Sequence, residues 1–269
     1  MLMPLEVPVQ ETLLTAPSVI VSRSVALDDP SSARAALIDP AGAFLLIDKP
    51  YGYTSFSVVN QIRRRITRAT GIKRVKVGHA GTLDPLATGL LILATRRCTK
   101  SISVLSNMDK VYCVRMRLGV TSPSHDLETK IEISGDPIAL DRTTIAETVQ
   151  KLEISESQVP PIFSAIKQQG KAVYHKARAG QAVTMESRPV TFHSISIVSV
   201  ELPFVTLTVH CGKGTYIRSL VHDIGELLGV GAVMTDLERT SVGEFNNHEA
   251  LTYDEAIALL ETNAAETSW

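Results

Sequence analysis

Apolar residues recur at two different spacings along the chain, and these spacings predict both helices and strands. Over residues 54–67 they return every three or four positions, as on one buried face of a helix. Residues 110–118 alternate between apolar and polar side chains, which is typical of a strand. Two further apolar runs, 190–202 and 204–211, flank a proline and predict a hairpin. The other predicted elements are a strand at 44–47, helices at 96–106, 141–152, 172–179, 215–228 and 251–262, and one or two strands within 231–245.

The irregular mixture of strands and helices favours an α+β fold. The strands do not alternate with helices as βαβ units require, so we expect a mixed, mostly antiparallel sheet flanked by helices. Residues 1–42 have no lasting period and contain two Asp-Pro turn signals. We therefore expect these residues to form a poorly ordered or loosely docked N-terminal extension.

The composition is typical of a globular protein in a reducing compartment. The 269 residues allow one large domain or two smaller ones. No apolar run has the length of a membrane span, and the N-terminus resembles neither a signal peptide nor a transit peptide. Three scattered cysteines without CxxC spacing argue against a disulfide framework and against a zinc site. We expect a cytoplasmic location and no membrane association.

Basic residues are concentrated in one part of a chain whose net charge is −1. Residues 60–117 contain thirteen Lys and Arg against two Asp, whereas residues 244–269 contain six acidic residues and no Lys or Arg. A basic block of this size favours a polyanionic partner, above all nucleic acid. The alternative is that these side chains only form the solvated face of a helix.

A glycine-rich stretch, residues 77–91, contains one carboxylate and one imidazole, those of Asp84 and His79. Pro85 disfavours helical backbone at Asp84, and the glycines allow a sharp, closely packed loop. An apolar run follows, so the acid is placed at the edge of a rigid scaffold, which is typical of a functional loop. The alternative is an Asx-turn, in which Asp84 only caps its own backbone.

Residues 78–89, with the sequence GHAGTLDPLATG, closely resemble the signature of the TruB family of tRNA pseudouridine synthases. The segment PLAT within it resembles the stand-alone bacterial members more than their guide-RNA-dependent relatives. Four further stretches are similar to family motifs, in the family's order, and extend the resemblance over residues 44–245. They are LIDKPYGYTS at 46–55, KVY at 110–112 leading to Leu118 and Gly119, PPIFSAIK at 160–167 with Gly170, Lys171 and Tyr174, and GTYIRSL at 214–220.

The resemblance implies a fold and an activity. It implies the pseudouridine synthase fold with a central active-site cleft, which would occupy residues 43–250. Members of the family convert uridine 55 in the T loop of tRNA to pseudouridine without a cofactor. The N-glycosidic bond is cut, the uracil turns, and C5 is joined to the ribose. The expected partner is therefore the T arm of tRNA, and we expect a monomer that requires no protein partner.

Three residues match the catalytic positions of the family. Asp84 matches the nucleophile, a role open to an ionised carboxylate. Arg218 matches an arginine that pairs with this aspartate and keeps it ionised. Tyr112 matches the tyrosine that stacks on the target base, which must be flipped out of its loop before the reaction. Taken alone, Arg218 could be a helix-surface residue and Tyr112 an ordinary strand aromatic.

Five further residues match substrate-binding or supporting positions. His79 matches a histidine that contacts the flipped-out region of the RNA, and Tyr216 and Leu237 match substrate contacts. Lys49 and Pro50 match a support for the active-site loop. Outside the motifs, His79 would be a structural histidine and Leu237 a core residue. The remaining histidines share no spacing, so none is assigned to a metal.

Two features depart from the family pattern. Glu238 stands where a basic residue is common, which would weaken a local RNA contact. Many members continue into a PUA domain, whereas residues 251–269 are expected to form only an acidic helix or tail, too short for that domain. Two other functions stay open: RNA binding without catalysis, and the same isomerisation on another RNA. The presence of both Asp84 and Arg218 argues against the first.

Overall fold

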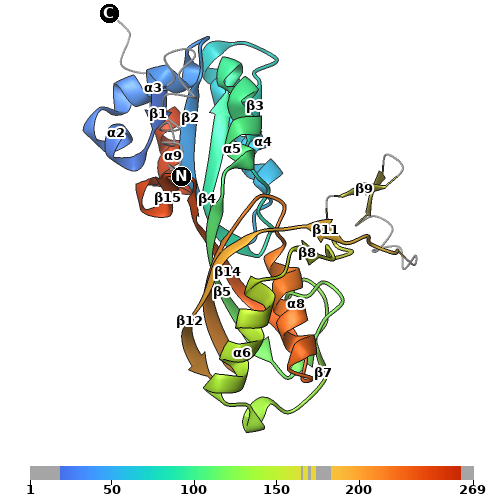
Figure 1. Ribbon diagram of the computed structural model, residues 1–269. Helices are drawn as coiled ribbons and strands as arrows, with labels where there is room; N and C mark the ends of the chain where they lie inside the picture. The colour runs from blue at the N-terminus through green and yellow to red at the C-terminus, as the bar shows by residue number, and fades with distance from the viewer. Residues whose placement is uncertain (1–18, 165, 169–170, 174–182, 262–269) are drawn as a thin grey trace, which may run out of the picture. The chain divides into compact units, whose positions relative to one another are not determined.

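The computed structural model describes residues 19–164, 166–168, 171–173 and 183–261. The chain divides into two compact units. The first unit comprises Met1–Met108 and Arg239–Trp269, and the second comprises Asp109–Glu238. Each unit contains β-strands with helices packed against them (Figure 1). Among the described residues, no helix combines the length and the apolar character that crossing a membrane requires.

Strand β2 (Ala43–Lys49) is central to the sheet of the first unit. It pairs antiparallel with β4 (Ala87–Thr95) and parallel with both β1 (Val19–Val21) and β16 (Leu251–Thr252). Strand β3 (Val77–His79) pairs with β4. Nearly every residue of β2 and β4 is buried, as expected for continuous apolar strands that are covered on both faces.

Helix α4 (Ser55–Thr70) is the long amphipathic helix of the first unit. The Thr54 hydroxyl accepts from the backbone N–H of Ser57 at its start, and Gly71, with a φ of +71°, ends it. The predicted helix is confirmed, and it runs three residues beyond the expected end. Its buried residues are Ser55, Val58, Val59, Ile62 and Ile66. Helix α9 (Tyr253–Glu261) packs against it.

Residues 19–42 are packed into the first unit, where the sequence predicts a loosely docked extension. Strand β1 extends the sheet, and helices α2 (Arg23–Asp28) and α3 (Pro30–Ile38) follow, capped by Ser22 and Asp29. The side chains of Val21, Ala33 and Leu37 are each at most 1% exposed. Each element is too short to show a period in the sequence, and its burial depends on strands that come later in the chain.

The remaining elements of the first unit are short. The helix predicted at 96–106 is a 3₁₀ turn that passes into one turn and a half of α-helix. These elements are η1 (Arg96–Ser101), α5 (Ile102–Asn107), β15 (Phe245–Asn246) and η3 (Asn247–Glu249).

The second unit is built on an antiparallel sheet in the order β5 (Lys110–Leu118), β13 (Phe204–Cys211) and β12 (Phe192–Glu201). The predicted hairpin between β12 and β13 is confirmed. Strand β14 (Ala232–Val242) lies beside β5, and its residues 239–242 belong to the first unit.

This sheet has one buried face and one open face. Alternate residues of β5 and β13 are buried, among them Tyr112 and Val209, which lie opposite each other. Helix α6 (Arg142–Glu153) contacts β12, and helix α8 (Ile217–Leu227) contacts β5. The alternation therefore places Tyr112 on the buried face and its neighbour Val111 on the open one.

The other elements of the second unit are short pairs and turns. The predicted α+β fold with a mixed, mostly antiparallel sheet is confirmed, while residues 174–179 of the helix predicted at 172–179 lie outside the described residues. The short elements are β6 (Val120–Thr121) with β7 (Glu132–Ile133), β8 (Ser157–Gln158) with β11 (Arg188–Pro189), β9 (Lys167–Gln168) with β10 (Lys171–Ala172), and η2 (Pro137–Ala139).

The burial of Leu37 predicts that the N-terminal elements stabilise the fold. We expect Leu37→Ala to lower the free energy of unfolding by about 2–5 kcal/mol, because it leaves a cavity in a packed site. Leu27→Ala is the matched control, since that leucine is 64% exposed, and should change stability by less than about 0.5 kcal/mol. Urea unfolding measures both values. Equal effects of the two substitutions would show that residues 19–42 contribute no core.

Candidate active site

Asp84 lies on the loop between β3 and β4 in the first unit. Its backbone carbonyl accepts from the N–H of Ala87 at 3.1 Å, which closes a tight turn over Pro85. Gly81 and Gly89, on either side of this turn, have φ values of +91° and +96°. Positive φ values strain residues that carry a Cβ atom, so glycine is the favoured residue at both positions. The Asp84 side chain is half-buried.

Ser55 and Lys49 hold the residues on both sides of Asp84. The buried Ser55 hydroxyl accepts from the N–H of Leu83 at 2.8 Å and donates to its carbonyl at 3.1 Å. The Lys49 ammonium donates to the carbonyls of Pro85 at 3.3 Å, Pro50 at 2.9 Å and Tyr53 at 2.7 Å. The peptide groups that flank Asp84 are therefore fixed by the first turn of α4 and by the end of β2.

The Lys49 ammonium is fully buried and also supplies charge to the loop. Burial lowers the pKa of Lys49 to about 8, and attraction to the carboxylates of Asp84 and Asp48 opposes this effect. Three backbone carbonyls around the ammonium compensate for lost water. Lys49 thus combines a structural role with positive charge near Asp84.

Arg239, on β14, is a second buried cation that contacts this loop, and the sequence alone assigns it no role. It is 1% exposed, and its guanidinium donates to the carbonyls of Leu90 at 2.8 Å and Gly81 at 3.2 Å. A Cβ atom on Gly89 would lie 2.4 Å from the Arg239 carbonyl oxygen, so the two backbones are in direct contact. No alternation of apolar and polar residues in β14 marks this arginine, and only the fold shows which glycines it faces.

His79 lies at the end of β3 and is half-buried. Burial lowers the pKa of His79 below its ordinary value, and the charge of Arg239 adds to this, while a hydrogen bond with the Gly81 backbone opposes it. The imidazole is therefore neutral at pH 7, and it can act as a hydrogen-bonding group rather than as a cation.

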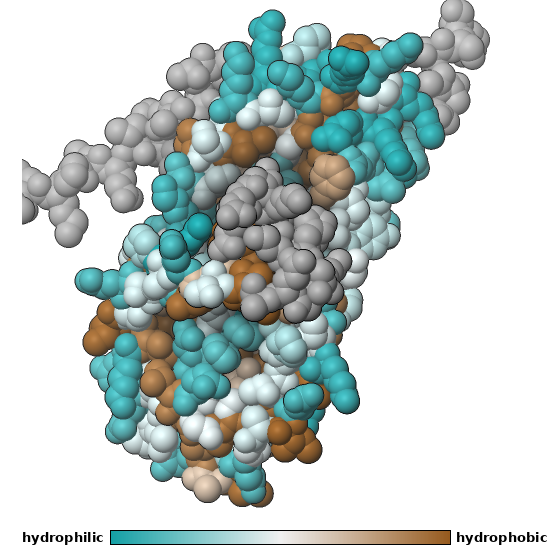
Figure 2. Space-filling model, turned by 90° about the vertical axis from the view of Figure 1, so that its right-hand side faces the viewer, coloured by the Kyte–Doolittle hydropathy of each residue, from teal (hydrophilic) through white to brown (hydrophobic). Residues whose placement is uncertain are grey.

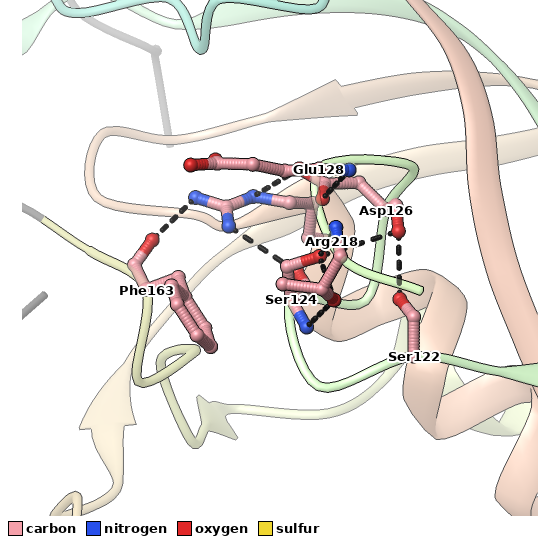
Figure 3. Close-up of polar contacts among 7 residues, drawn as sticks. Ser122, Ser124, Asp126, Glu128, Phe163 and Arg218 are labelled. Atoms are coloured by element: carbon pink, nitrogen blue, oxygen red, sulfur yellow. Dashed lines mark hydrogen bonds and ion pairs between the residues drawn. The ribbon is translucent and has the colours of Figure 1, made fainter. Parts of the chain in front are cut away.

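In the second unit, Arg218 lies in the first turn of α8 and is buried (Figure 3). Its guanidinium donates to the carbonyls of Phe163 at 2.9 Å and Ser124 at 3.3 Å. Its Nε atom lies 3.7 Å from a carboxylate oxygen of Asp126, which is equally buried. A guanidinium bound from three directions has a fixed orientation.

Asp126 is held by its own loop, residues 122–129. Its backbone carbonyl accepts from the hydroxyls of Ser122 at 2.7 Å and Ser124 at 3.2 Å, and its carboxylate accepts from the N–H of Glu128 at 2.9 Å (Figure 3). The sequence reads as a polar turn at this point and gave no reason to single out Asp126. Its position beside Arg218 comes from the folding of residues far apart in the chain.

A stacked histidine pair lies near the same arginine. The rings of His125 and His222 are 4.0 Å apart and nearly parallel. Burial lowers the pKa of His125 to about 4, and the charges of His222 and Arg218 contribute to this. His125 is therefore neutral at pH 7 and adds no positive charge beside the guanidinium.

The other predicted site residues of the second unit lie on separate elements. Tyr112 is on the buried face of β5 and is 9% exposed. The N–H of Tyr216 donates to the Gln158 side chain at 2.9 Å at the start of α8. Leu237 is buried in β14.

The predicted site residues are thus distributed over both units. The structure gathers Lys49, Pro50, His79 and Asp84 around one loop of the first unit. Arg218 belongs to the second unit, so its pairing with Asp84 stays a prediction.

The basic block divides into structural and exposed residues. Arg63 donates to the Val77 carbonyl at 2.9 Å, and Arg65 forms an ion pair with Glu261 of α9 at 2.9 Å. Figure 2 shows hydrophilic side chains over much of the face on the side of α4 and α5. The exposed basic residues of the first unit between positions 60 and 100 are Arg64, Arg68, Lys73, Arg74, Lys76, Arg97 and Lys100.

Comparison with known families identifies two matching models. Residues 64–217 match the family described as TruB family pseudouridylate synthase (N terminal domain). Residues 218–268 match the family described as tRNA pseudouridylate synthase B C-terminal domain. Together the two models cover the loop of Asp84 and the helix of Arg218.

Curated relatives carry the name tRNA pseudouridine synthase B. The one from Flavobacterium johnsoniae is 43% identical over 211 residues, which is 78% of this chain and 92% of the relative. The one from Chloroherpeton thalassium is 44% identical over 219 residues, 81% of this chain and 90% of the relative.

Solved structures with a similar fold include a Cbf5 complex and an H/ACA RNP. A Cbf5-Nop10-Gar1 complex aligns with a TM-score of 0.61 and 29% identity, covering 81% of this chain and 54% of that chain. An H/ACA RNP bound to a substrate RNA containing 2'-deoxyuridine aligns with a TM-score of 0.57 and 27% identity. The chain therefore spans about half the length of these structural relatives.

The contact between Gly89 and Arg239 predicts a specific packing requirement in the loop of Asp84. We expect Gly89→Ala to lower the free energy of unfolding by about 1–3 kcal/mol more than Gly71→Ala, since an added methyl group overpacks a closed site. Gly71 is the matched control, because its φ is also positive but a Cβ there would meet nothing within 4 Å. Urea unfolding of the two variants gives the difference. Equal losses would mean that the backbone conformation alone requires glycine at position 89.

Proposed function

The chain belongs to the TruB family of pseudouridylate synthases, and on that premise we propose that it isomerises uridine 55 in the T loop of tRNA, with Asp84 as nucleophile. It is a tRNA pseudouridine synthase, an enzyme that converts uridine to pseudouridine in tRNA. The observation that carries the proposal for Asp84 is its loop, in which Ser55, Lys49 and Arg239 hold the backbone around a half-buried carboxylate.

The isomerisation requires a nucleophile and a proton transfer. The bond from N1 of uracil to the ribose breaks, a bond from C5 to the ribose forms, C5 loses a proton, and N1 gains one. An ionised carboxylate can attack a carbon of the target nucleotide and can also accept a proton. No electrons enter or leave, so the residues of the chain are sufficient and we propose no cofactor.

Arg218 and Lys49 would keep Asp84 in the required ionised form. The Lys49 ammonium and the Asp84 carboxylate attract each other. We propose that the Arg218 guanidinium, oriented by Phe163 and Asp126, pairs with the same carboxylate in the working enzyme.

The remaining predicted residues would bind the flipped-out base and the supporting loop. Tyr112 would stack on the uracil, and the neutral His79 would hydrogen-bond to the flipped-out region of the RNA. Tyr216 and Leu237 would contact the substrate. Pro50, whose carbonyl accepts from Lys49, would help to fix the loop.

We further propose that the enzyme acts on the T arm as a monomer, in the cytoplasm and without a protein partner. Arg63 and Arg65 bind groups of the protein itself, whereas the exposed basic residues of the first unit face solvent. These exposed residues support a polyanionic substrate. This surface would bind phosphates without reading sequence.

Asp84→Asn tests the nucleophile. Incubation with an unmodified tRNA transcript, followed by mass spectrometry of the T-loop fragment, should show product formation reduced by at least about a thousandfold. Binding of the tRNA should persist, since the substitution removes the charge but keeps the shape. Asp28→Asn, at an exposed acid outside the loop, is the matched control and should retain full activity. Full turnover by Asp84→Asn would refute the assignment.

The same assay tests the position and the RNA. A transcript with cytidine at position 55 should give no pseudouridine, and a bare T-arm hairpin should be a substrate. Product at another uridine, or an equal rate on unrelated hairpins, would contradict the proposed specificity while leaving the family activity intact.

The exposed basic residues predict a salt-dependent affinity. A triple variant, Lys73→Ala with Arg74→Ala and Lys76→Ala, should bind tRNA more weakly, because fewer counterions are released on binding. The slope of log affinity against log salt should fall by about two to three, at about 0.7–0.9 for each lost phosphate contact. Filter binding at several salt concentrations gives the slopes. Lys151→Ala, at an exposed lysine of α6, is the control, and an unchanged slope for the triple variant would exclude this surface from the interface.

A further inference from the structure

Three side chains of the kinds that bind metal ions meet in the second unit. They are Asp109, His193 and His210, and their ligand atoms all lie within 4.8 Å of one another. Each comes from a different strand region: Asp109 directly precedes β5, His210 is on β13, and His193 is on β12. None of the three belongs to the residues proposed for the isomerisation. Their spacing in the sequence gave no metal motif, because the β12–β13 hairpin and the start of β5 bring them together.

The strand register explains why the two histidines meet. His210 pairs with Ser194 on β12 and with Val111 on β5. The register shifts between Phe192 and Ser194, so His193 is the additional residue of a β-bulge. Bulges redirect side chains, and the His193 ring lies 4.6 Å from the His210 ring, centroid to centroid. The strand pairing and the bulge thus bring the two imidazoles together.

Asp109 completes the cluster from the third strand region. Its carboxylate oxygen lies 3.1 Å from Nε2 of His193. Gly212, the residue opposite its strand end, has no side chain there, and a Cβ on it would lie 3.8 Å from the other carboxylate oxygen. The two histidines and the aspartate are exposed or half-buried, so an ion could reach them from solvent.

The distances suit a shared ion. With metal–ligand bonds of about 2.0–2.2 Å, neighbouring ligand atoms in one coordination sphere lie about 3.0–3.6 Å apart. The separation of 3.1 Å between His193 and Asp109 is within that range, and the ligand atom of His210 lies within 4.8 Å of both. Two imidazoles and one carboxylate are a donor set for zinc and its neighbours, not for magnesium or calcium.

We propose that Asp109, His193 and His210 bind one divalent transition-metal ion of the zinc class. The ion would tie the start of β5 to the β12–β13 hairpin and so stabilise the sheet of the second unit. Three protein ligands leave at least one coordination position for water or another oxygen ligand. The alternative is a simple surface contact between His193 and Asp109 without a metal.

Zinc titration of the full chain, without an affinity tag, separates these possibilities. After treatment with EDTA and dialysis, calorimetric titration with ZnCl₂ should show one ion bound per chain. His210→Ala should lower the zinc affinity by at least about a hundredfold, because an imidazole ligand is lost. His248→Ala is the control, since that histidine is exposed and lies outside the cluster, and it should bind zinc as the wild type does.

A second measurement guards against misfolding of the variant. Zinc should raise the melting temperature of the wild type and of His248→Ala, but not that of His210→Ala, because only an ion bound to the folded state stabilises it. The melting temperature of each protein in EDTA is the baseline from which its zinc-dependent shift is measured. Asp109→Asn, which keeps the shape of the side chain, should also lose the zinc-dependent shift. Absence of zinc binding by the wild type, or equal binding by His210→Ala, would overturn the proposal.

Discussion

The loop of Asp84 depends on two buried cations that donate to its backbone carbonyls. Lys49 reaches Pro85 from one side and Arg239 reaches Gly81 from the other. A buried charge is costly unless it is hydrogen-bonded, and so is a buried carbonyl. Each cation here hydrogen-bonds to carbonyls of the loop, which favours the conformation that brings these groups together. A carboxylate in such a loop needs little reorganisation when it reacts, which is the advantage of a preorganised site.

Arg218 is fixed by the same kind of contact in the second unit. Its guanidinium binds the carbonyls of Ser124 and Phe163, and the Asp126 carboxylate lies beside it. Carbonyls orient a guanidinium without neutralising it, whereas one carboxylate removes part of its charge. The arginine therefore keeps a defined direction and attraction for a second anion. Neutral His125, with its lowered pKa, places no competing positive charge nearby.

The elements that the sequence predicted well are those defined by local patterns. Helix α4 has a Thr54 cap, a continuous apolar face and a terminal glycine, and all three are visible within one segment. The β12–β13 hairpin is equally local. The parallel pairing of β1 with β2 is not, because it joins short segments that have no pattern of their own. Asp126, Arg239 and the His193–His210 pair escaped prediction for the same reason: their roles arise from residues far away in the chain.

The glycines of the Asp84 loop allow close backbone packing. A glycine-rich loop suggests flexibility, but Gly89 lies against the Arg239 backbone, where a Cβ would be 2.4 Å from its carbonyl oxygen. Close packing of two backbones at Gly89 adds to the requirement that its positive φ already sets, and the Arg239 guanidinium donates to the carbonyls of Gly81 and Leu90. Rigidity, not mobility, is what these glycines provide. The same close packing links the end of β14 to the loop that carries Asp84, so the conformation of this loop depends on a strand more than 140 residues further along the chain.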